Sequence, residues 1–178
     1  TISILPFLYE MVGRQRRIAK RQGITMNVNV LRSESLGSIH VKSADPAEPP
    51  AIKFNFLSSQ HDRDGLLAAM RKGRELMATS PVAEMTGEEI APGIDKQTDE
   101  ELLEWVRNNA ETTYHPIGTC KMGEDPMAVV DNQLRVHGIE GLRVADASIM
   151  PTLTSGNTNA PSIMIGEKCA SMVLASAT

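Results

Sequence analysis

The chain has 178 residues, of which 41% are apolar and 22% charged, and its formal net charge is −4. This length is enough for one core and part of a second, and the slightly acidic balance argues against nucleic-acid binding. No apolar run approaches the roughly 20 residues that a membrane-spanning helix needs. Two cysteines without a C-x-x-C spacing argue against a disulfide framework and favour a reducing, cytoplasmic setting.

The first residues have the pattern of a strand and not of a secretory leader. Thr1 is followed at once by the strand-like residues 2–5, so we expect the sequence to start inside a larger protein. A basic run comes next; on a helix it would form a solvated face, with contact to an acidic membrane surface as the alternative. The run consists of Arg14, Arg16, Arg17, Lys20 and Arg21.

Three short segments, residues 24–32, 38–42 and 52–56, have the alternation of half-buried strands. In the first of them Met26, Val28 and Val30 share one face. Prolines break the chain between the second and third segments, because proline removes a backbone donor and restricts its predecessor. Strands this close in sequence predict an antiparallel meander.

Two helices follow the predicted strands. Residues 61–78 carry an apolar face at helical spacing, and this helix should end near Ser80-Pro81. Residues 98–101 have the spacing of a capping box, in which Thr98 and Glu101 satisfy each other's backbone amides. A sheet with helices segregated from it predicts an α+β fold.

The chain becomes rich in glycine and small residues from Tyr114 onward. Asp131-Asn132-Gln133 should form a turn between two short extended segments. The last element, at about 160–174, has Pro161 in its first turn, as helix N-termini favour. One side of this helix is small, which predicts close packing against another backbone or a cofactor; its residues are Ser162, Gly166 and Ala170.

Among the four histidines, His115 is the best candidate for chemistry. It follows a helix, precedes a proline and heads a loop that runs from Gly118 to Gly123. The spacings of the histidines and cysteines match no closed zinc pattern, so no metal site is expected. The sequence has no Gly-x-Ser-x-Gly elbow and no P-loop. It also has no G-x-G-x-x-G turn to hold a dinucleotide.

Three segments together resemble a known enzyme family. Residues 114–123 read Tyr-His-Pro-Ile-Gly-Thr-Cys-Lys-Met-Gly, residues 155–161 read Ser-Gly-Asn-Thr-Asn-Ala-Pro, and residues 141–151 join them. In this order and spacing they resemble the C-terminal signature of the glucose–methanol–choline (GMC) family of flavin-dependent alcohol oxidoreductases. Within that family the chain is most similar to choline dehydrogenases and related alcohol dehydrogenases, from about Gly23 to Val173.

The resemblance implies a division of the chain. Residues 1–113 would be a substrate-binding region, an antiparallel sheet with helices packed on it. Residues 114–178 would supply active-site loops and a C-terminal strand and helix that return to the FAD-binding domain. The N-terminal Rossmann part of that domain is missing here. We therefore expect FAD in the full-length enzyme and no FAD on this chain alone.

The resemblance also implies residue roles. His115 matches the family's active-site histidine and Asn157 a second active-site position. A histidine can accept the hydroxyl proton of an alcohol, and an amide can donate to the developing alkoxide. His61 stands where choline-oxidising relatives place a substrate-contacting histidine. Residues that would lie next to the flavin are Asp146, Ala147, Asn157, Thr158 and Asn159, with Thr158 where many members have proline.

The expected reaction is oxidation of a primary, choline-like alcohol to an aldehyde by hydride transfer to flavin. Two alternatives stay open. An oxidase of the same family would pass the electrons to oxygen, and the isolated chain would be a non-catalytic structural or binding module. The expected partners are a small alcohol and the missing FAD-binding part.

Overall fold

The computed structural model describes residues 1–12 and 15–176, which separate into two compact units. Unit 1 consists of Thr1–Val30 and Leu57–Glu111, and unit 2 of Leu31–Phe56 and Thr112–Thr178. Helices and small antiparallel sheets occur together, so the predicted α+β class is confirmed. The division of roles at residue 113 stays a prediction.

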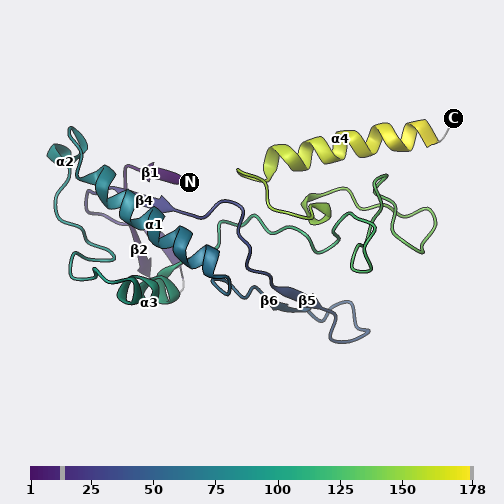
Figure 1. Cartoon of the computed structure of the whole chain (residues 1–178), viewed down its shortest axis with the longest axis horizontal. Helices are drawn as coiled ribbons and strands as arrows, with labels where there is room; N and C mark the ends of the chain where they lie inside the picture. Colours follow the sequence, from purple (N-terminus) through teal and green to yellow (C-terminus); the bar gives the residue numbers. More distant parts are fainter. Residues whose placement is uncertain (13–14, 177–178) are drawn as a thin grey trace. The chain divides into compact units, whose positions relative to one another are not determined.

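Within the described residues, the strands form three separate two-stranded antiparallel sheets (Figure 1). The pairs are β1 (Ile2–Leu5) with β4 (Thr25–Val28), β2 (Tyr9–Val12) with β3 (Gln15–Ile18), and β5 (Ser38–His40) with β6 (Ala51–Lys53).

The predicted meander is therefore wrong in its pairing. The first predicted strand, β4, pairs with the N-terminal strand so that Ile2 lies opposite Val28, and only β5 and β6 pair with each other. Alternation showed which segments are extended, but it carries no information on their partners, and β4 and β5 belong to different units.

Among the described residues, the basic run does not lie on a helix, in contrast to the expectation from the sequence. Arg17 lies in β3 opposite Glu10, and Lys20 and Arg21 follow that strand; Arg14 lies outside the described residues. Among the helices of the described chain, none combines the length and apolar character needed to cross a membrane.

Helix α1 (Gln60–Met77) confirms the predicted helix and packs on β4 in unit 1. The contact depends on a glycine: a Cβ at Gly73 would lie 2.9 Å from Met26 Sδ and 3.6 Å from Val28 Cγ1. Both residues belong to the predicted apolar face of the strand. A side chain at this position would have to push aside the flexible end of Met26, so the absence of a Cβ at Gly73 leaves room for the apolar side chains of β4 against the helix.

The capping box at the start of α3 (Asp99–Asn109) is confirmed. Thr98 Oγ1 accepts from the Glu101 amide at 3.3 Å, and Glu101 Oε2 accepts from the Thr98 amide at 2.9 Å. The helix buries Leu102 and Val106. The segment between α1 and α3 contains one short helix, α2 (Val82–Met85).

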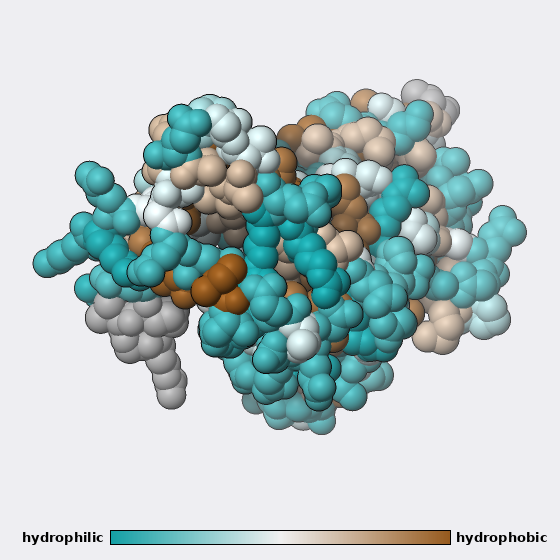
Figure 2. Space-filling view, turned by 60° about the vertical axis from the view of Figure 1, so that its left-hand side comes forward, coloured by the Kyte–Doolittle hydropathy of each residue, from teal (hydrophilic) through white to brown (hydrophobic). Residues whose placement is uncertain are grey.

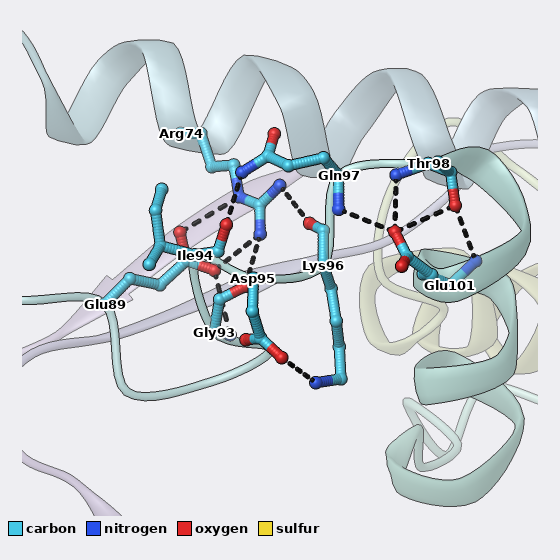
Figure 3. Close-up of polar contacts among 9 residues, drawn as sticks. All are labelled: Arg74, Glu89, Gly93, Ile94, Asp95, Lys96, Gln97, Thr98 and Glu101. Carbon is cyan, nitrogen blue, oxygen red and sulfur yellow. Dashed lines mark hydrogen bonds and ion pairs between the residues drawn. The ribbon is translucent and has the colours of Figure 1, made fainter.

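Arg74 fixes the loop between α2 and α3 (Figure 3). Its Nε and Nη2 donate to the two carboxylate oxygens of Glu89 at 2.9 and 2.8 Å, a bidentate pair. The same guanidinium donates to the carbonyls of Lys96 at 2.9 Å and Gly93 at 3.1 Å. One side chain of α1 thus holds the chain that leads into the α3 cap.

Unit 2 is built mainly from irregular chain that packs beneath helix α4 (Asn159–Ser176) (Figure 1). Apart from the β5–β6 pair, the described extended segments of this unit meet in isolated bridges, such as Val130 with Val136 across the predicted turn at 131–133. The core consists of Val130, Leu134, Ile149, Met150 and Ile165.

The small side of α4 does not pack closely within this chain. A Cβ at Gly166 would meet no heavy atom within 4 Å, and Ala170 is exposed. The larger side chains Ile163 and Met164 are also exposed, at 60% and 58%. A helix that is apolar on several sides is usually buried. This stretch of α4 therefore resembles an internal helix, but the described chain leaves part of its apolar surface exposed.

Candidate active site

The glycine-rich loop at residues 114–123 lies along a short 3-10 turn, η1 (Ala147–Ile149). The amide of Cys120 donates to Ser148 O at 3.0 Å, and the amide of Met122 donates to Ile149 O at 2.7 Å. Gly118 has a φ of +84°, a backbone conformation that glycine adopts without strain. These bonds fix the loop to the segment that carries the predicted flavin-contacting residues.

His115 points its Nδ1 at the hydroxyl of Thr158, at 2.9 Å. Thr158 is only 7% exposed and directly precedes α4, where its carbonyl accepts from the amide and the hydroxyl of Ser162 at 3.0 and 2.7 Å. Tyr114, just before the histidine, has a φ of +59°, a strained conformation for a side chain of this size. The half-buried histidine is thereby anchored to the first turn of α4.

Asn157 and Asn159 flank Thr158, and both are exposed. Within the described chain the Asn157 side chain forms no hydrogen bond, so its amide is available to a ligand. The preceding turn is held from a distant segment, because Arg32 Nε donates to Ser155 Oγ at 2.7 Å. The amide of Asn157 is therefore carried on a turn that is anchored at both ends.

Asp146 caps η1, where its Oδ1 accepts from the Ser148 amide at 2.7 Å. The residue is exposed, and its other carboxylate oxygen has no hydrogen bond or ion pair to the described residues. An exposed carboxylate oxygen of this kind is a natural acceptor for a hydroxyl group. Ala147, the first residue of η1, adds no polar side chain that would compete for such a ligand.

A salt bridge stabilises the far end of the loop. Lys121 Nζ lies 2.9 Å from Asp125 Oδ1. The Lys121 ammonium, helped by the Met127 amide, lowers the pKa of the Asp125 carboxyl from its ordinary value. The carboxylate therefore remains charged in mildly acidic solution and keeps the chain folded back on itself after Gly123.

The structure brings the predicted site residues of unit 2 together in one region of the fold. His115 contacts Thr158 directly, Asn157 and Asn159 flank it, and Asp146 and Ala147 lie on the turn that the same loop contacts. His61 lies in the first turn of α1, in unit 1, and is exposed. The roles of these residues stay predictions.

Two features of the site had no sequence signal. The bond between His115 and Thr158 joins positions 43 residues apart, and that between Arg32 and Ser155 spans 123 residues. Neither spacing is a pattern that local geometry produces.

In the described part of the chain, no group of three His, Cys, Asp or Glu side chains is placed to hold a metal ion.

This site lies inside a region that a family model identifies. Residues 33–166 match the model described as GMC oxidoreductase, so the chain belongs to this family of oxidoreductases. The match includes the glycine-rich loop, η1 and the start of α4.

The chain is similar to an oxygen-dependent choline dehydrogenase of Escherichia coli, at 53% identity over 154 residues. It is similar also to an oxygen-dependent choline dehydrogenase of Shigella flexneri, at 52% identity over the same length. In both comparisons 86% of this chain is covered, but only 28% of the relative.

Solved structures show the same fold. Pyridoxine 4-oxidase from Mesorbium loti matches with a TM-score of 0.74 at 30% identity, over 84% of this chain and 28% of that protein. A fungal aryl-alcohol oxidase matches with a TM-score of 0.73 at 35% identity, over 82% and 24%. A formate oxidase of Aspergillus oryzae, studied for the modification of its FAD, has a TM-score of 0.71 at 32% identity, over 79% and 25%.

Proposed function

We propose that this chain forms the C-terminal part of an FAD-dependent oxidoreductase that oxidises a primary, choline-like alcohol to its aldehyde. The hydrogen bond between His115 Nδ1 and Thr158 Oγ1 carries the proposal. It leaves Nε2 as the free ring nitrogen and holds the histidine next to the turn that bears Asn157.

In this proposal His115 handles the hydroxyl proton. With Nδ1–H donated to Thr158, Nε2 carries the lone pair and accepts the proton of the alcohol. Negative charge then grows on the substrate oxygen, and Asn157 donates an amide hydrogen bond to it. An amide suits this role because it stabilises an oxyanion without titrating itself. The hydrogen bond that orients His115 and the anchored turn that carries Asn157 lower the ordering cost of the reaction.

The donors and acceptors of the site fit FAD. In the complete enzyme, FAD would supply the hydride-accepting chemistry. Asp146 has an oxygen available for a ribityl hydroxyl, and the backbone at Ala147 would lie beside the same part of the cofactor. The turn of Asn157, Thr158 and Asn159 would lie beside the ring system. We propose that a further, N-terminal part of the enzyme completes the cofactor site.

The substrate class is supported by the relatives named for choline. A quaternary ammonium is usually enclosed by aromatic or acidic groups, and this chain is only 3% aromatic. We propose that His61 contributes to the substrate side and that the rest of the enclosure comes from outside this chain. Comparing choline with simple aliphatic alcohols as substrates of the complete enzyme tests this part of the proposal.

The test of the catalytic role is His115→Ala in the complete enzyme. We expect turnover to fall by ~10²-fold or more, the scale of a positioned acid–base group. Flavin absorbance should be retained, because the imidazole is proposed to act on the substrate proton and not to hold the cofactor. Steady-state rates and the absorbance spectrum are measured on the same preparation.

The matched control is His137→Ala. His137 is exposed in the same unit and contacts the carbonyl of Gly123 at 3.0 Å through Nε2. It should leave turnover near that of the wild type. Unchanged turnover in His115→Ala, with FAD still bound, would contradict the assignment.

A second candidate is an oxidase of the same family. The relatives are named oxygen-dependent, and the matched structures are oxidases, which favours oxygen as an acceptor. The yield of hydrogen peroxide for each aldehyde formed distinguishes an oxidase from a dehydrogenase that uses another acceptor. As an isolated fragment the chain is proposed to be colourless and inactive, and flavin absorbance of the purified chain tests that.

A further inference from the structure

A cationic cleft lies in unit 2, between the second half of α4 and the segment from Gln133 to Arg143. Its volume is about 470 Å³, and three basic side chains line it: Arg135, Arg143 and Lys168. None of the described residues that line it is an Asp or a Glu. A concave surface with one sign of charge attracts ligands of the other sign, so the cleft is suited to an anion.

Two of the basic side chains are placed directly opposite each other. Arg135 and Arg143 are partners in an antiparallel bridge, an arrangement that is unfavourable for like charges. Arg135 is compensated by Asp131, whose Oδ2 accepts from Nε at 2.8 Å. Asp131 Oδ1 accepts from the amides of Gln133 at 2.8 Å and Arg135 at 2.9 Å. Both of its oxygens are engaged, so it leaves Arg143 without a counter-charge.

Arg143 is the unusual member of the cleft. Its Nε is buried and has no hydrogen-bond partner among the described residues. Lys168, across the cleft on α4, also has no ion pair within the described chain. A buried N–H of a charged group is costly when no acceptor reaches it, and native proteins rarely leave one unpaired. The positive charges of Arg143 and Lys168 are therefore not balanced by an acidic side chain among the described residues that line the cleft.

We propose that this cleft is a carboxylate-binding site, filled in the complete enzyme by an acidic side chain from the part of the protein that this chain does not span. A guanidinium and an ammonium that line the same cleft can both donate to one carboxylate, and Arg143 and Lys168 supply these two charges. The curated relatives are more than three times as long as the stretch matched here, which covers 28% of them. This proposal rests on the proposed function, in which a further part of the enzyme completes the cofactor site.

The same half of α4 has a second sign of missing cover. Val173 and Leu174 are 46% and 70% exposed, close in sequence to the cleft residues Met172 and Ala175. Apolar side chains grouped on a surface mark a contact with another part of a protein. A carboxylate on that part would enter the cleft as the apolar side chains are covered.

Zero-length cross-linking of the complete enzyme tests the proposal. A water-soluble carbodiimide joins a lysine amine to a carboxylate in contact with it, and mass spectrometry identifies the pair. We expect Lys168 to be linked to an Asp or Glu that lies outside residues 1–178. Lys121 and Asp125, 2.9 Å apart in the same unit, provide the internal positive control.

Variants of the complete enzyme sharpen the result. Arg143→Gln should lower the yield of the Lys168 link by about tenfold, since a charge-assisted contact is worth at least that factor. Arg107→Gln, which removes a guanidinium that contacts Glu104 in unit 1, should leave the yield unchanged. The wild-type experiment stands by itself if a variant does not fold.

Two outcomes would overturn the proposal. One is a Lys168 link to a residue within 1–178. The other is the absence of any Lys168 link while Lys121 and Asp125 are joined, as expected if the cleft takes only free anions. Alcohol oxidation by the same preparation tests the proposed function separately, because an active enzyme without the link refutes only the carboxylate site.

Discussion

The two units of the chain differ in how completely they satisfy their own side chains. In unit 1, Arg74 is surrounded by four acceptors from a single loop (Figure 3), and the α3 cap satisfies its own amides. In unit 2, Arg143 and Lys168 have no counter-charge within the described chain. In unit 1 these polar groups find their partners within the unit, whereas in unit 2 the two basic side chains do not.

The apolar surface is distributed in the same way. Among the described residues, most of the exposed large apolar side chains belong to unit 2, with Leu36 81%, Val41 87% and Tyr114 76% exposed. Phe54 and Phe56 stack with their ring centroids 5.0 Å apart while both stay at least half exposed. Figure 2 shows apolar residues, in brown, at the surface among hydrophilic ones. Unit 2, which carries the candidate active site, is thus the unit that leaves more of its apolar side chains uncovered.

Two natural probes report on the units separately. The single tryptophan, Trp105, lies in α3 of unit 1, and both cysteines, Cys120 and Cys169, lie in unit 2. Tryptophan fluorescence therefore follows the unfolding of unit 1. Thiol labelling follows the opening of unit 2, because both thiols are half-buried.

The largest effect on stability is expected for Leu102→Ala. Leu102 is 1% exposed in the core of unit 1, and removing its side chain leaves a cavity. We expect the free energy of unfolding of unit 1 to fall by about 3 kcal/mol. Urea titration followed by Trp105 fluorescence measures the loss, and the urea dependence of thiol labelling should stay near that of the wild type.

Leu76→Ala is the control for this comparison. Leu76 is 42% exposed on α1, and its removal should change the unfolding free energy by no more than about 0.5 kcal/mol. If Leu102→Ala exposed the thiols at the same lowered urea concentration, the two units would unfold together and their separation would be wrong.

The next effect concerns the site of unit 2. Thr158→Val removes the hydroxyl that contacts His115 and keeps the shape of the side chain. In the complete enzyme we expect kcat to fall about tenfold, the equivalent of one aligning hydrogen bond of about 1.4 kcal/mol. KM should change little, because the hydroxyl is proposed to orient the imidazole and not to bind the alcohol.

Thr158→Ser separates orientation from packing. Serine keeps the hydroxyl and loses only a methyl group, so kcat should return to near the wild-type value. A serine variant as slow as the valine variant, or a valine variant in which only KM rises, would show that the hydroxyl does not position His115.

Local patterns predicted local structure well. The capping box at Thr98 and Glu101, the apolar face of α1 and the turn at residues 131–133 are all present, because each depends on residues within a few positions of one another. The partner of β4 was not predictable, since alternation defines a strand and not its neighbour.

The candidate site was likewise predictable only in part. The identity of the candidates at His115 and Asn157 came from motifs, whereas the contact of His115 with Thr158 depends on the path of the chain between them. The unpaired Nε of Arg143 had no sequence signal, because arginine in a short extended segment is ordinarily solvated. A missing hydrogen-bond partner can be recognised only from the positions of the atoms around the group.

The smallest effect is expected for Glu101→Gln, and it tests whether unit 1 closes its network as described. The Thr98 amide first, then the Thr98 hydroxyl and the Gln97 amide, lower the pKa of the Glu101 carboxyl from its ordinary value. Since the folded pKa lies below the unfolded one of about 4.3, the carboxylate stabilises unit 1 above that pH. This contribution is lost as the pH falls through the folded pKa. The glutamine variant does not titrate here, so its difference from the wild type should shrink towards acidic pH in urea titrations followed by Trp105. Glu100→Gln, which removes a carboxylate from the same turn without breaking a cap bond, is the control and should lower the stability less at neutral pH. A difference from wild type that stays constant with pH in Glu101→Gln would contradict the cap's electrostatic role.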